Sequence, residues 1–318
     1  MIDLMLIVGI LVATLLAWNA LNRLLPRGHV DPQNKAIMVT GCDTGFGHAL
    51  AKRLDSLGFT VFAACLNSKG LGADKLRSEA SSKLVIMQMD VTNDDEVLAA
   101  VETVKKHIAY PEKGLWGLVN NAGLSTFGAI EWCSMDVYSR LLEVNLCGMI
   151  RVTRAFLPLV RKSQGRVVNM GSAVGRLAVP DCSCYCVSKY GVEGFSQCLR
   201  YEMRKFGVDV SIIEPGHYIA ATSIYSEDSV NQMGDSMWKS MSDEVRNAYT
   251  KEYFDSRVQG MHYYRTMGTK DVSPVINSLV DALMSKKPQL RYENKELYWH
   301  IRLFSILHLP EFIVEKIF

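Results

Sequence analysis

Short apolar runs alternate with amphipathic stretches over most of the chain, and this alternation predicts the fold. Residues 36–40 (AIMVT) precede a glycine-rich turn, as a buried parallel strand does, and a helical pattern follows over residues 46–57. Further strands are expected at residues 60–66, 84–89, 115–120, 166–170 and 208–213. Strands that alternate with helices predict an α/β fold, a doubly wound parallel sheet with helices on both faces.

The N-terminal end of the chain departs from this pattern. Residues 4–22 carry no charged side chain and are mostly apolar, which is long enough for one membrane-spanning helix. Basic residues follow this run and none precedes it, so residues 1–25 are interpreted as a signal anchor that leaves the rest of the chain in the cytosol. We expect a polar linker over residues 26–34 and one folded domain over residues 35–296.

The alternation loosens again after Gly216. Residues 217–269 are polar and aromatic, and we expect them to form a helical lid over a substrate cleft within the same domain. The last stretch, residues 297–318, mixes large apolar with basic side chains. Two interpretations of this stretch stay open: an amphipathic segment that contacts membrane lipid, and a helix packed on the domain.

Composition narrows the function classes. The chain has 318 residues, enough for one large core, and a formal net charge of +2 without a long basic run, so nucleic acid is not an expected partner. Eight cysteines in a chain of this size do not imply a disulfide framework. Cys182, Cys184 and Cys186 lie close together, but no second Cys/His cluster stands at zinc-ligand spacing. We expect no metal and interpret them as small, partly buried thiols near a helix start.

Residues 40–47 (TGCDTGFG) join the first strand to the first helix. Glycines allow a tight turn and a close approach to a pyrophosphate, and a helix N-terminus favours phosphate groups. The spacing T-G-x-x-x-G-x-G resembles that of the short-chain dehydrogenase/reductase superfamily, which implies a Rossmann-type sheet and a nicotinamide cofactor. The cofactor contacts implied by the resemblance, from this loop and from the ends of later strands, are Gly41, Cys42, Asp43, Gly45, Phe46, Gly47, Leu66, Asp90, Val91, Asn121, Ala122, Gly123, Pro215 and Gly216.

The end of the second strand normally selects between the two nicotinamide cofactors. An acidic group there accepts the ribose hydroxyls of NAD, whereas a basic group favours the 2′-phosphate of NADP. Residues 65–69 (CLNSK) hold neither an acid nor an arginine. We expect NAD rather than NADP.

The pattern Y-x-x-x-K at Tyr185 and Lys189 lies on an expected helix, where it places a phenol and an ammonium one turn apart. Oxidation of an alcohol requires a base, and a positive charge next to a tyrosine lowers the pKa of the phenol from about 10. Ser172, at a strand end, is suited to hold the reacting oxygen. The resemblance adds Asn145 as the support of a water relay to the lysine, and cofactor contacts from Tyr185 and Lys189.

Further stretches, including residues 116–123 (WGLVNNAG) and 214–226 (EPGHYIAATSIYS), resemble the membrane-bound D-β-hydroxybutyrate dehydrogenases of animals. Their clade also contains retinol dehydrogenases and 17β-hydroxysteroid dehydrogenase type 2. The resemblance implies reversible NAD-dependent oxidation of (R)-3-hydroxybutyrate to acetoacetate, a dependence on phosphatidylcholine, and a homo-oligomer.

The chain also departs from the hydroxybutyrate enzymes. It opens with an apolar segment where they carry a mitochondrial presequence, so the anchor favours the endoplasmic reticulum and the resemblance favours mitochondria. His217 replaces their asparagine after Pro-Gly, and residues 181–184 lack their arginine. A hydroxy acid needs a cation or several donors for its carboxylate, and His217 or lysine and arginine residues of the lid are the candidates, although a solvent-facing His217 is an equal alternative. Together with Ser172, which would hold the reacting oxygen, His217 is an expected substrate contact.

Two other functions stay open. An apolar cleft under the lid would suit a membrane-bound retinol or hydroxysteroid dehydrogenase. A catalytically silent nucleotide-binding scaffold is a remote third reading, which the intact Tyr185 and Lys189 pair disfavours.

Overall fold

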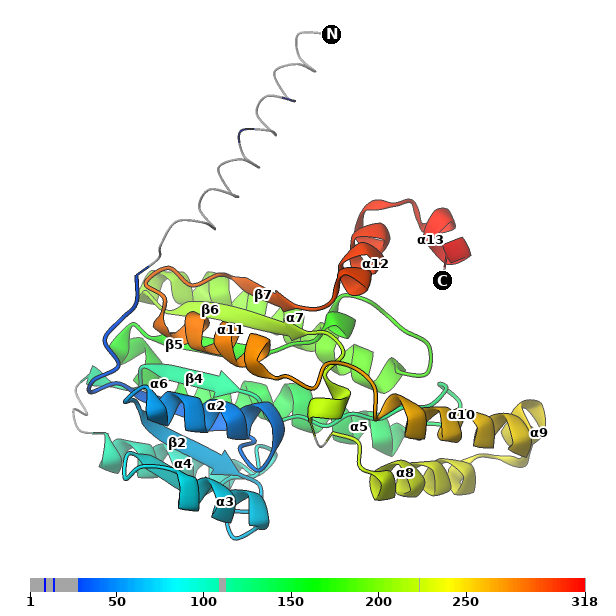
Figure 1. Ribbon diagram of the computed structural model, residues 1–318, viewed down its shortest axis with the longest axis horizontal. Helices are drawn as coiled ribbons and strands as arrows, with labels where there is room; N and C mark the ends of the chain where they lie inside the picture. The colour runs from blue at the N-terminus through cyan, green and yellow to red at the C-terminus, as the bar shows by residue number, and fades with distance from the viewer. Residues whose placement is uncertain (1–8, 10–13, 15–27, 109–112, 223, 318) are drawn as a thin grey trace.

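The computed structural model describes residues 9, 14, 28–108, 113–222 and 224–317, and its centre is one parallel sheet (Figure 1). The strand order is β3-β2-β1-β4-β5-β6-β7, and all six neighbouring pairs are parallel. The strands are β1 (Ala36–Thr40), β2 (Thr60–Cys65), β3 (Leu84–Gln88), β4 (Gly117–Asn120), β5 (Arg166–Met170), β6 (Asp209–Pro215) and β7 (Arg291–Asn294). The expected doubly wound sheet is therefore confirmed.

Four of the six expected strands have bounds that differ from the expected ones by one or two residues. β4 begins two residues later than expected, at Gly117, and β6 continues to Pro215. The last strand, β7, was not predicted because its sequence, RYEN, carries one buried side chain, Tyr292, and no apolar run. It pairs with β6 from Ile212 opposite Arg291 onward, so tertiary pairing rather than local pattern decides its structure.

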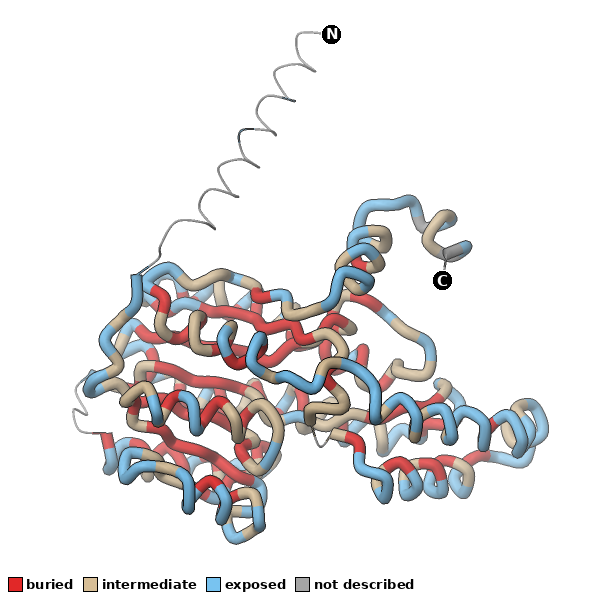
Figure 2. The backbone as a smooth tube through the Cα atoms, in the orientation of Figure 1, coloured by how far each residue is buried: buried red, intermediate tan, exposed pale blue. Residues whose placement is uncertain are grey.

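Two helical layers cover the sheet, and the core lies between each layer and the strands (Figures 1 and 2). One layer consists of α2 (Gly45–Ser56), α3 (Leu71–Glu79) and α11 (Ser273–Met284). The other consists of α4 (Asp94–His107), α6 (Met149–Ser163) and α7 (Ser183–Met203). In α6 the buried Val152, Phe156 and Leu159 follow helical spacing, which is why this stretch folds as a helix with one face on the sheet.

The expected lid region contains three helices that extend away from the sheet (Figure 1). They are α8 (Glu227–Ser240), α9 (Asp243–Tyr249) and α10 (Lys251–Tyr264). A capping box between Ser226 and Ser229 starts α8, and the side chain of Ser242 caps α9. These helices share a third apolar cluster, built around Trp132 and Phe254, with residues of the sheet domain.

The C-terminal segment forms α12 (Leu297–His308) and α13 (Glu311–Ile317). Within α12 the only fully buried side chain is Leu303, whereas Leu297, Ile301 and Phe304 are exposed. Figure 2 shows how little of this segment is buried. In the single chain, most of the large apolar side chains of α12 are therefore exposed.

Residues 1–25, interpreted as an anchor, lie outside the described residues except for Gly9 and Thr14. None of the helices described elsewhere in the chain is long and apolar enough to cross a membrane. The described part of the expected linker is tied to the domain, because His29 bridges Ser285 and the amide of Val30 donates to the carbonyl of Met284 at 2.8 Å.

Candidate active site

The strand order reverses between β1 and β4, and in open parallel sheets ligands bind beyond the strand ends at this point. The two strand ends are clasped together by hydrogen bonds. The hydroxyl of Thr40 accepts from the amides of Asn121 and Ala122, at 3.0 and 2.9 Å, and the side chain of Asn121 donates to the carbonyls of Thr40 and Gly41. The expected cofactor contact Asn121 thus uses its side chain to hold the glycine loop.

The glycine loop has no room for side chains at two of its positions. A Cβ at Gly41, where φ is +69°, would lie 2.8 Å from the Cα of Ala122. A Cβ at Gly47 would lie 2.2 Å from the carbonyl oxygen of Gly41. The loop leads into α2, whose first amides have no partner within the helix. A bare backbone at a helix N-terminus fits the pyrophosphate of a dinucleotide.

Two other loop residues face the protein rather than the cofactor side. Cys42 is fully buried, its amide donates to the carbonyl of Ala64 at 2.9 Å, and burial raises the pKa of its thiol. Phe46 packs edge-on against Tyr218 with ring centroids 5.7 Å apart. At Gly45, where φ is +61°, a Cβ would meet the side chain of Thr222 at 3.6 Å, so the segment after β6 lies over the loop.

Asp43 supplies the acidic group that residues 65–69 lack. Its two carboxylate oxygens accept from the amides of Leu66 and Asn67, at 2.8 and 2.9 Å. The side chain of Leu66 itself is exposed. The glycine loop therefore delivers a carboxylate to the end of β2, the position that selects between the two cofactors in this fold.

The ends of β3 and β4 hold the other expected adenine-side contacts. The carboxylate of Asp90 accepts from the amide and the hydroxyl of Thr92, both at 2.8 Å, and Val91 is buried against Gly148. A Cβ at Gly123 would lie 3.2 Å from the side-chain oxygen of Asn145. The backbone after β4 thus runs directly beside this asparagine.

Asn145 lies in a π-type turn, Glu143–Gly148, between α5 (Met135–Leu142) and α6. Turns of this kind interrupt the regular helix ladder and occur often at functional sites. The buried Asn145 side chain accepts from the amide of Leu124 at 2.7 Å and donates to the Leu124 carbonyl at 2.9 Å and to the Ser188 hydroxyl at 3.0 Å. It joins the loop after β4 to the helix that carries Lys189.

Lys189 is buried on α7, and its ammonium donates to the carbonyl of Met170 at 2.9 Å. Its Nζ lies 5.6 Å from the ring centroid of Tyr185. Burial lowers the pKa of Lys189 to about 8, and the negative charge of Glu193 opposes this lowering. The lysine is thus a cation fixed beneath the phenol, and its charge is sensitive to its surroundings.

The hydroxyl of Ser172 lies near that of Tyr185 and lowers the pKa of the phenol. Burial raises this pKa more strongly, and Cys182 adds to the rise. Burial therefore dominates, and the net direction is opposite to the lowering expected from a neighbouring positive charge. Ser172 also caps the short helix η3 (Ala173–Gly175), which fixes its position after β5.

Comparisons with known proteins identify this arrangement. The sequence profile of the family described as "short chain dehydrogenase" matches residues 35–230. The chain is 49% identical to "D-beta-hydroxybutyrate dehydrogenase, mitochondrial" of Rattus norvegicus over 89% of its own length and 83% of the relative. It is 39% identical to "Retinol dehydrogenase 7" of Mus musculus over 96% of its own length and 94% of the relative.

The chain belongs to the short chain dehydrogenase family. A crystal structure of a short chain dehydrogenase/reductase from Burkholderia phymatum in complex with NAD has the same fold, with a TM-score of 0.69 and 20% identity over 87% of this chain and 96% of that one. The resemblance to the hydroxybutyrate dehydrogenases is confirmed, and so is the expectation of an alcohol dehydrogenase.

In this dehydrogenase the strand β7, which was not predicted, fixes the segment at the end of β6 that contains Pro215 and Gly216. The amide of Gly216 donates to the carbonyl of Asn294 at 2.8 Å, and a Cβ at Gly216 would lie 2.9 Å from the Cβ of Lys295. Pro215 ends β6 beside the buried Glu214. The β7 strand therefore positions the loop that was expected to close over the nicotinamide.

Polar side chains near Tyr185 come from the lid side of the dehydrogenase. The hydroxyls of Ser125 and Tyr225 are 2.7 Å apart, and both Tyr185 and Tyr264 act electrostatically on the buried Tyr225. His217 stacks on Tyr264 with ring centroids 4.5 Å apart. Sequence reasoning found His217 but missed Tyr225 and Tyr264, because no local motif relates them to residues so far away in the chain.

His217 is partly buried, and its Nε2 has no hydrogen-bond partner among the described residues. Burial lowers the pKa of His217, and Glu296 opposes this effect. The imidazole is therefore neutral at neutral pH. A neutral imidazole carries one N–H and one acceptor nitrogen, so it offers a donor without a charge.

The three clustered cysteines stand at the start of α7. Cys182 is its N-cap residue and lies near Cys186, while Cys184 lies near Cys133. These neighbouring thiols lower the pKa of Cys184 and of Cys186 to about 7. No group of three or more ligating side chains that could hold a metal occurs in the part of the chain that the structure describes.

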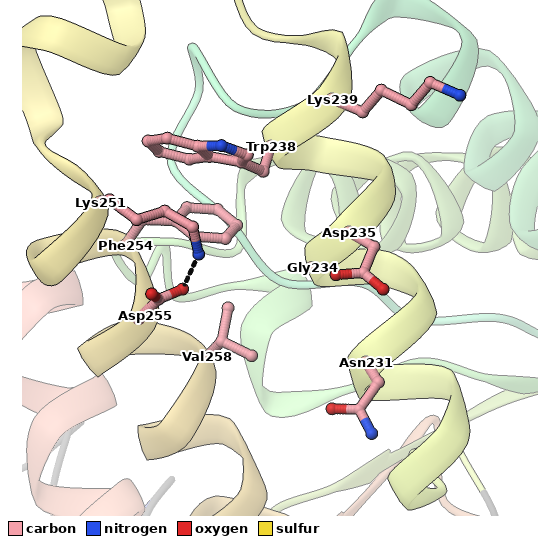
Figure 3. A pocket seen from close by; sticks show the side chains of 9 residues that line it. All are labelled: Asn231, Gly234, Asp235, Trp238, Lys239, Lys251, Phe254, Asp255 and Val258. Atoms are coloured by element: carbon pink, nitrogen blue, oxygen red, sulfur yellow. Dashed lines mark hydrogen bonds and ion pairs between the residues drawn. The ribbon is translucent and has the colours of Figure 1, made fainter.

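A groove of about 300 Å³ lies between α8 and α10 (Figure 3). Trp238, Phe254 and Val258 form its apolar wall. The ammonium of Lys251 already lies over it, 5.1 Å from the Trp238 ring and 5.5 Å from the Phe254 ring, and pairs with Asp255. None of the side chains expected to be catalytic lines this groove, which is therefore separate from the Tyr185 site.

Proposed function

We propose that the protein catalyses the reversible NAD-dependent oxidation of (R)-3-hydroxybutyrate to acetoacetate. The observation that carries this proposal is the meeting of Ser172, Tyr185 and Lys189 beyond the sheet end that holds the glycine loop. The similarity to the hydroxybutyrate dehydrogenase of Rattus norvegicus, 49% over most of both chains, supports the choice of alcohol.

In the proposed reaction, Ser172 holds the substrate hydroxyl and Tyr185 accepts its proton. Bound NAD supplies the hydride acceptor and a positive charge. Lys189 adds a second positive charge beneath the phenol, which favours the phenolate against the effect of burial. In the reverse direction Tyr185 returns the proton to the carbonyl oxygen of acetoacetate.

NAD is the preferred cofactor in this proposal because of Asp43. Its carboxylate stands at the end of β2, where the adenosine ribose of a dinucleotide binds in this fold. It has lone pairs left to accept from ribose hydroxyls, whereas it would repel a 2′-phosphate. Gly41 and Gly47 would admit the pyrophosphate, and Tyr185 and Lys189 would contact the nicotinamide ribose.

A small substrate agrees with the packing of the lid. Trp132 contacts Tyr249, Tyr253 and Phe254 edge-on, with ring centroids 5.0 to 6.1 Å apart, so these aromatic rings fill the lid rather than line a large cleft. The carboxylate of the substrate would then accept from neutral donors near Tyr185. His217 and the hydroxyls of Ser125 and Tyr225 are the available ones.

A retinol or hydroxysteroid substrate is the second candidate. Phe127, Met237 and Tyr225 belong to an apolar cluster that also contacts Tyr185, and such a surface suits a bulky apolar alcohol. The chain is also 39% identical to a retinol dehydrogenase. A small hydroxy acid is favoured over this candidate because the hydroxyl groups of Ser172, Tyr225 and Tyr264 lie near the phenol and His217 stacks on Tyr264.

A substrate panel separates the two candidates. Purified full-length protein in phosphatidylcholine vesicles is assayed with (R)- and (S)-3-hydroxybutyrate, all-trans-retinol and estradiol, each with NAD and with NADP. We expect turnover of the (R)-acid with NAD at a kcat/KM at least about tenfold above every other combination, which is a difference of about 1.4 kcal/mol. Turnover of retinol or estradiol alone would exclude the hydroxybutyrate proposal.

Membrane association is the next part of the proposal. Residues 4–22 would anchor the chain, and the exposed apolar side chains of α12 and α13, such as Phe304 and Phe312, would enter the interface of the bilayer. Such segments would hold the enzyme on a mitochondrial or endoplasmic reticulum membrane, the two locations left open by the sequence. Imaging of the tagged chain with markers for both organelles decides between them.

We also propose a homo-oligomer that pairs through α7. Its outer face exposes Val187, Tyr190 and Tyr201, which are large side chains in contact with solvent in the single chain. Burial of such side chains between two copies would stabilise a dimer. Sedimentation in detergent at several protein concentrations measures the assembly, and Tyr190→Glu should shift it toward the monomer.

A further inference from the structure

Glu193 lies on α7 one turn after Lys189 and has no part in the proposed proton and hydride transfers. Its side chain is only 12% exposed. One carboxylate oxygen, Oε2, pairs with Arg291 of β7 at 2.8 Å. The other, Oε1, is buried and has no hydrogen-bond partner among the described residues, which is a costly arrangement that calls for an explanation.

The surroundings of Glu193 are the two glycines that flank Ser172. A Cβ at Gly171 would lie 3.1 Å from Oε1, and a Cβ at Gly175 would lie 3.3 Å from the Cγ of Glu193. Any other residue at either position would meet this side chain. The glutamate therefore packs directly under the loop that presents Ser172, and this packing needs glycine on both sides.

Glu193 also acts electrostatically on the ammonium of Lys189. That ammonium donates to the carbonyl of Met170, and Met170 is the residue next to Gly171. Glu193 is the charged group that acts against the effect of burial on Lys189. A carboxylate one turn from a buried ammonium stabilises the charged form of the lysine.

Charged groups from the neighbouring elements hold Glu193 in place. Arg291 pairs both with Glu193 and with the buried Glu214 of β6. Arg176, after η3, lies 3.6 Å from Glu214, and Arg200 of α7 is affected by both Arg291 and Glu193. Because the half-buried Arg291 keeps Glu214 as a partner, neutralising Glu193 does not leave this arginine unpaired.

We propose that Glu193 is a positioning residue for hydride transfer, which supports the Ser172 loop from below and supplies the negative charge beside the Lys189 ammonium. It touches neither substrate nor cofactor and acts through these two residues. The inference rests on the proposed alcohol dehydrogenase chemistry, but it is independent of which alcohol the enzyme oxidises.

The sign of the expected pH effect follows from the charges. Without the carboxylate, burial lowers the pKa of Lys189 below its value of about 8. The ammonium then loses its proton at a lower pH, and the phenolate of Tyr185 loses its charge partner. The alkaline limb of the rate profile should therefore move toward lower pH.

The experiment compares three variants over the pH range of activity, with whichever alcohol the wild-type enzyme turns over. Glu193→Gln keeps the shape and removes the charge, Glu193→Asp keeps the charge and removes a methylene, and Glu202→Gln is a matched control on the exposed side of α7. Thermal unfolding of each variant checks that it is folded.

We expect Glu193→Gln to move the alkaline limb of the kcat/KM profile to a pH about one unit lower. At pH values above the shifted limb, kcat/KM should be about tenfold below that of the wild type. Glu193→Asp should keep the wild-type limb and lower kcat severalfold, because the Ser172 loop loses packing. Glu202→Gln should match the wild type. A Glu193→Gln profile that overlays the wild-type profile would overturn the proposal.

A second measurement does not depend on turnover. NMR titration of the Lys189 side chain in lysine-labelled protein, assigned by the loss of its signal in Lys189→Met, should show a lower pKa in Glu193→Gln than in wild type. If no alcohol is turned over, the proposed function fails while this titration still tests the inference. Equal pKa values in the two proteins would contradict the role assigned to Glu193.

Discussion

The nucleotide side and the lid side of this site are built in different ways. On the nucleotide side, backbone groups dominate: Gly41 and Gly47 leave no room for side chains, and Thr40 and Asn121 clasp two strand ends by hydrogen bonds to main-chain atoms. On the lid side, side chains dominate, as in the contacts of Tyr225 with Ser125 and of His217 with Tyr264.

The two sides therefore differ in how readily their residues can be substituted. A backbone cradle tolerates few substitutions, since a Cβ at Gly47 would collide with the loop itself. Side-chain contacts can be replaced one at a time, so the lid side is where related dehydrogenases with different alcohols can diverge. Tyr185, the proposed proton acceptor, should be the most sensitive position of all.

The largest effect is expected at Tyr185. Tyr185→Phe removes the phenolic proton acceptor but keeps the ring, so kcat should fall by about 10³-fold or more. Binding of NAD, followed by calorimetry, should change by less than about threefold, because the variant keeps the ring and leaves the glycine loop and Asp43 intact. A variant that retains a tenth of the wild-type kcat would show that another group carries the proton.

The second effect tests the nucleotide side. Asp43→Asn removes the negative charge at the end of β2, so the ratio of kcat/KM for NAD to that for NADP should fall by about tenfold or more. Asp95→Asn, an exposed aspartate in the first turn of α4, is the control and should leave the ratio unchanged. If the ratio of the two kcat/KM values is unchanged in Asp43→Asn, the Asp43 carboxylate does not select the cofactor.

The sequence predicted the nucleotide side far better than the lid side, and the reason is physical. The glycine loop and the Tyr185 and Lys189 pair are local patterns, so spacing alone places them. Inspection of residues 65–69 found no acid at the end of β2, because the carboxylate that lies there belongs to Asp43 of the glycine loop. β7 and the contact of Tyr225 with Ser125 depend on pairing between distant segments, which leaves no periodic pattern in the chain.

The third effect tests the lid side. His217→Ala removes an expected donor to the substrate carboxylate, and a hydrogen bond to a charged group contributes about 1.5–3 kcal/mol. We expect KM for (R)-3-hydroxybutyrate to rise by at least about tenfold while NAD binding stays constant. His107→Ala, at the exposed end of α4, is the control. A KM equal to that of the wild type would make His217 a packing residue for Tyr264.

The smallest effect on chemistry is expected at the C-terminus. Phe304→Glu places a charge on the apolar face of α12 and should lower binding to phosphatidylcholine vesicles by severalfold, because an exposed aromatic side chain no longer enters the interface. Turnover in detergent should stay within about twofold of the wild type, since α12 holds no catalytic group. The isolated exposed Leu71 provides the control variant, Leu71→Glu. Equal loss of vesicle binding in both variants would show that α12 is not a specific membrane-contacting segment.

The central claim is hydride transfer from (R)-3-hydroxybutyrate at Tyr185, and isotope transfer tests it most directly. The full-length enzyme is incubated with NAD and (R)-3-hydroxybutyrate that carries deuterium on the alcohol carbon, and the reduced cofactor is examined by mass spectrometry. We predict deuterium in the cofactor with the wild-type enzyme and only a trace with Tyr185→Phe. Failure of the wild-type enzyme to transfer deuterium would contradict the account.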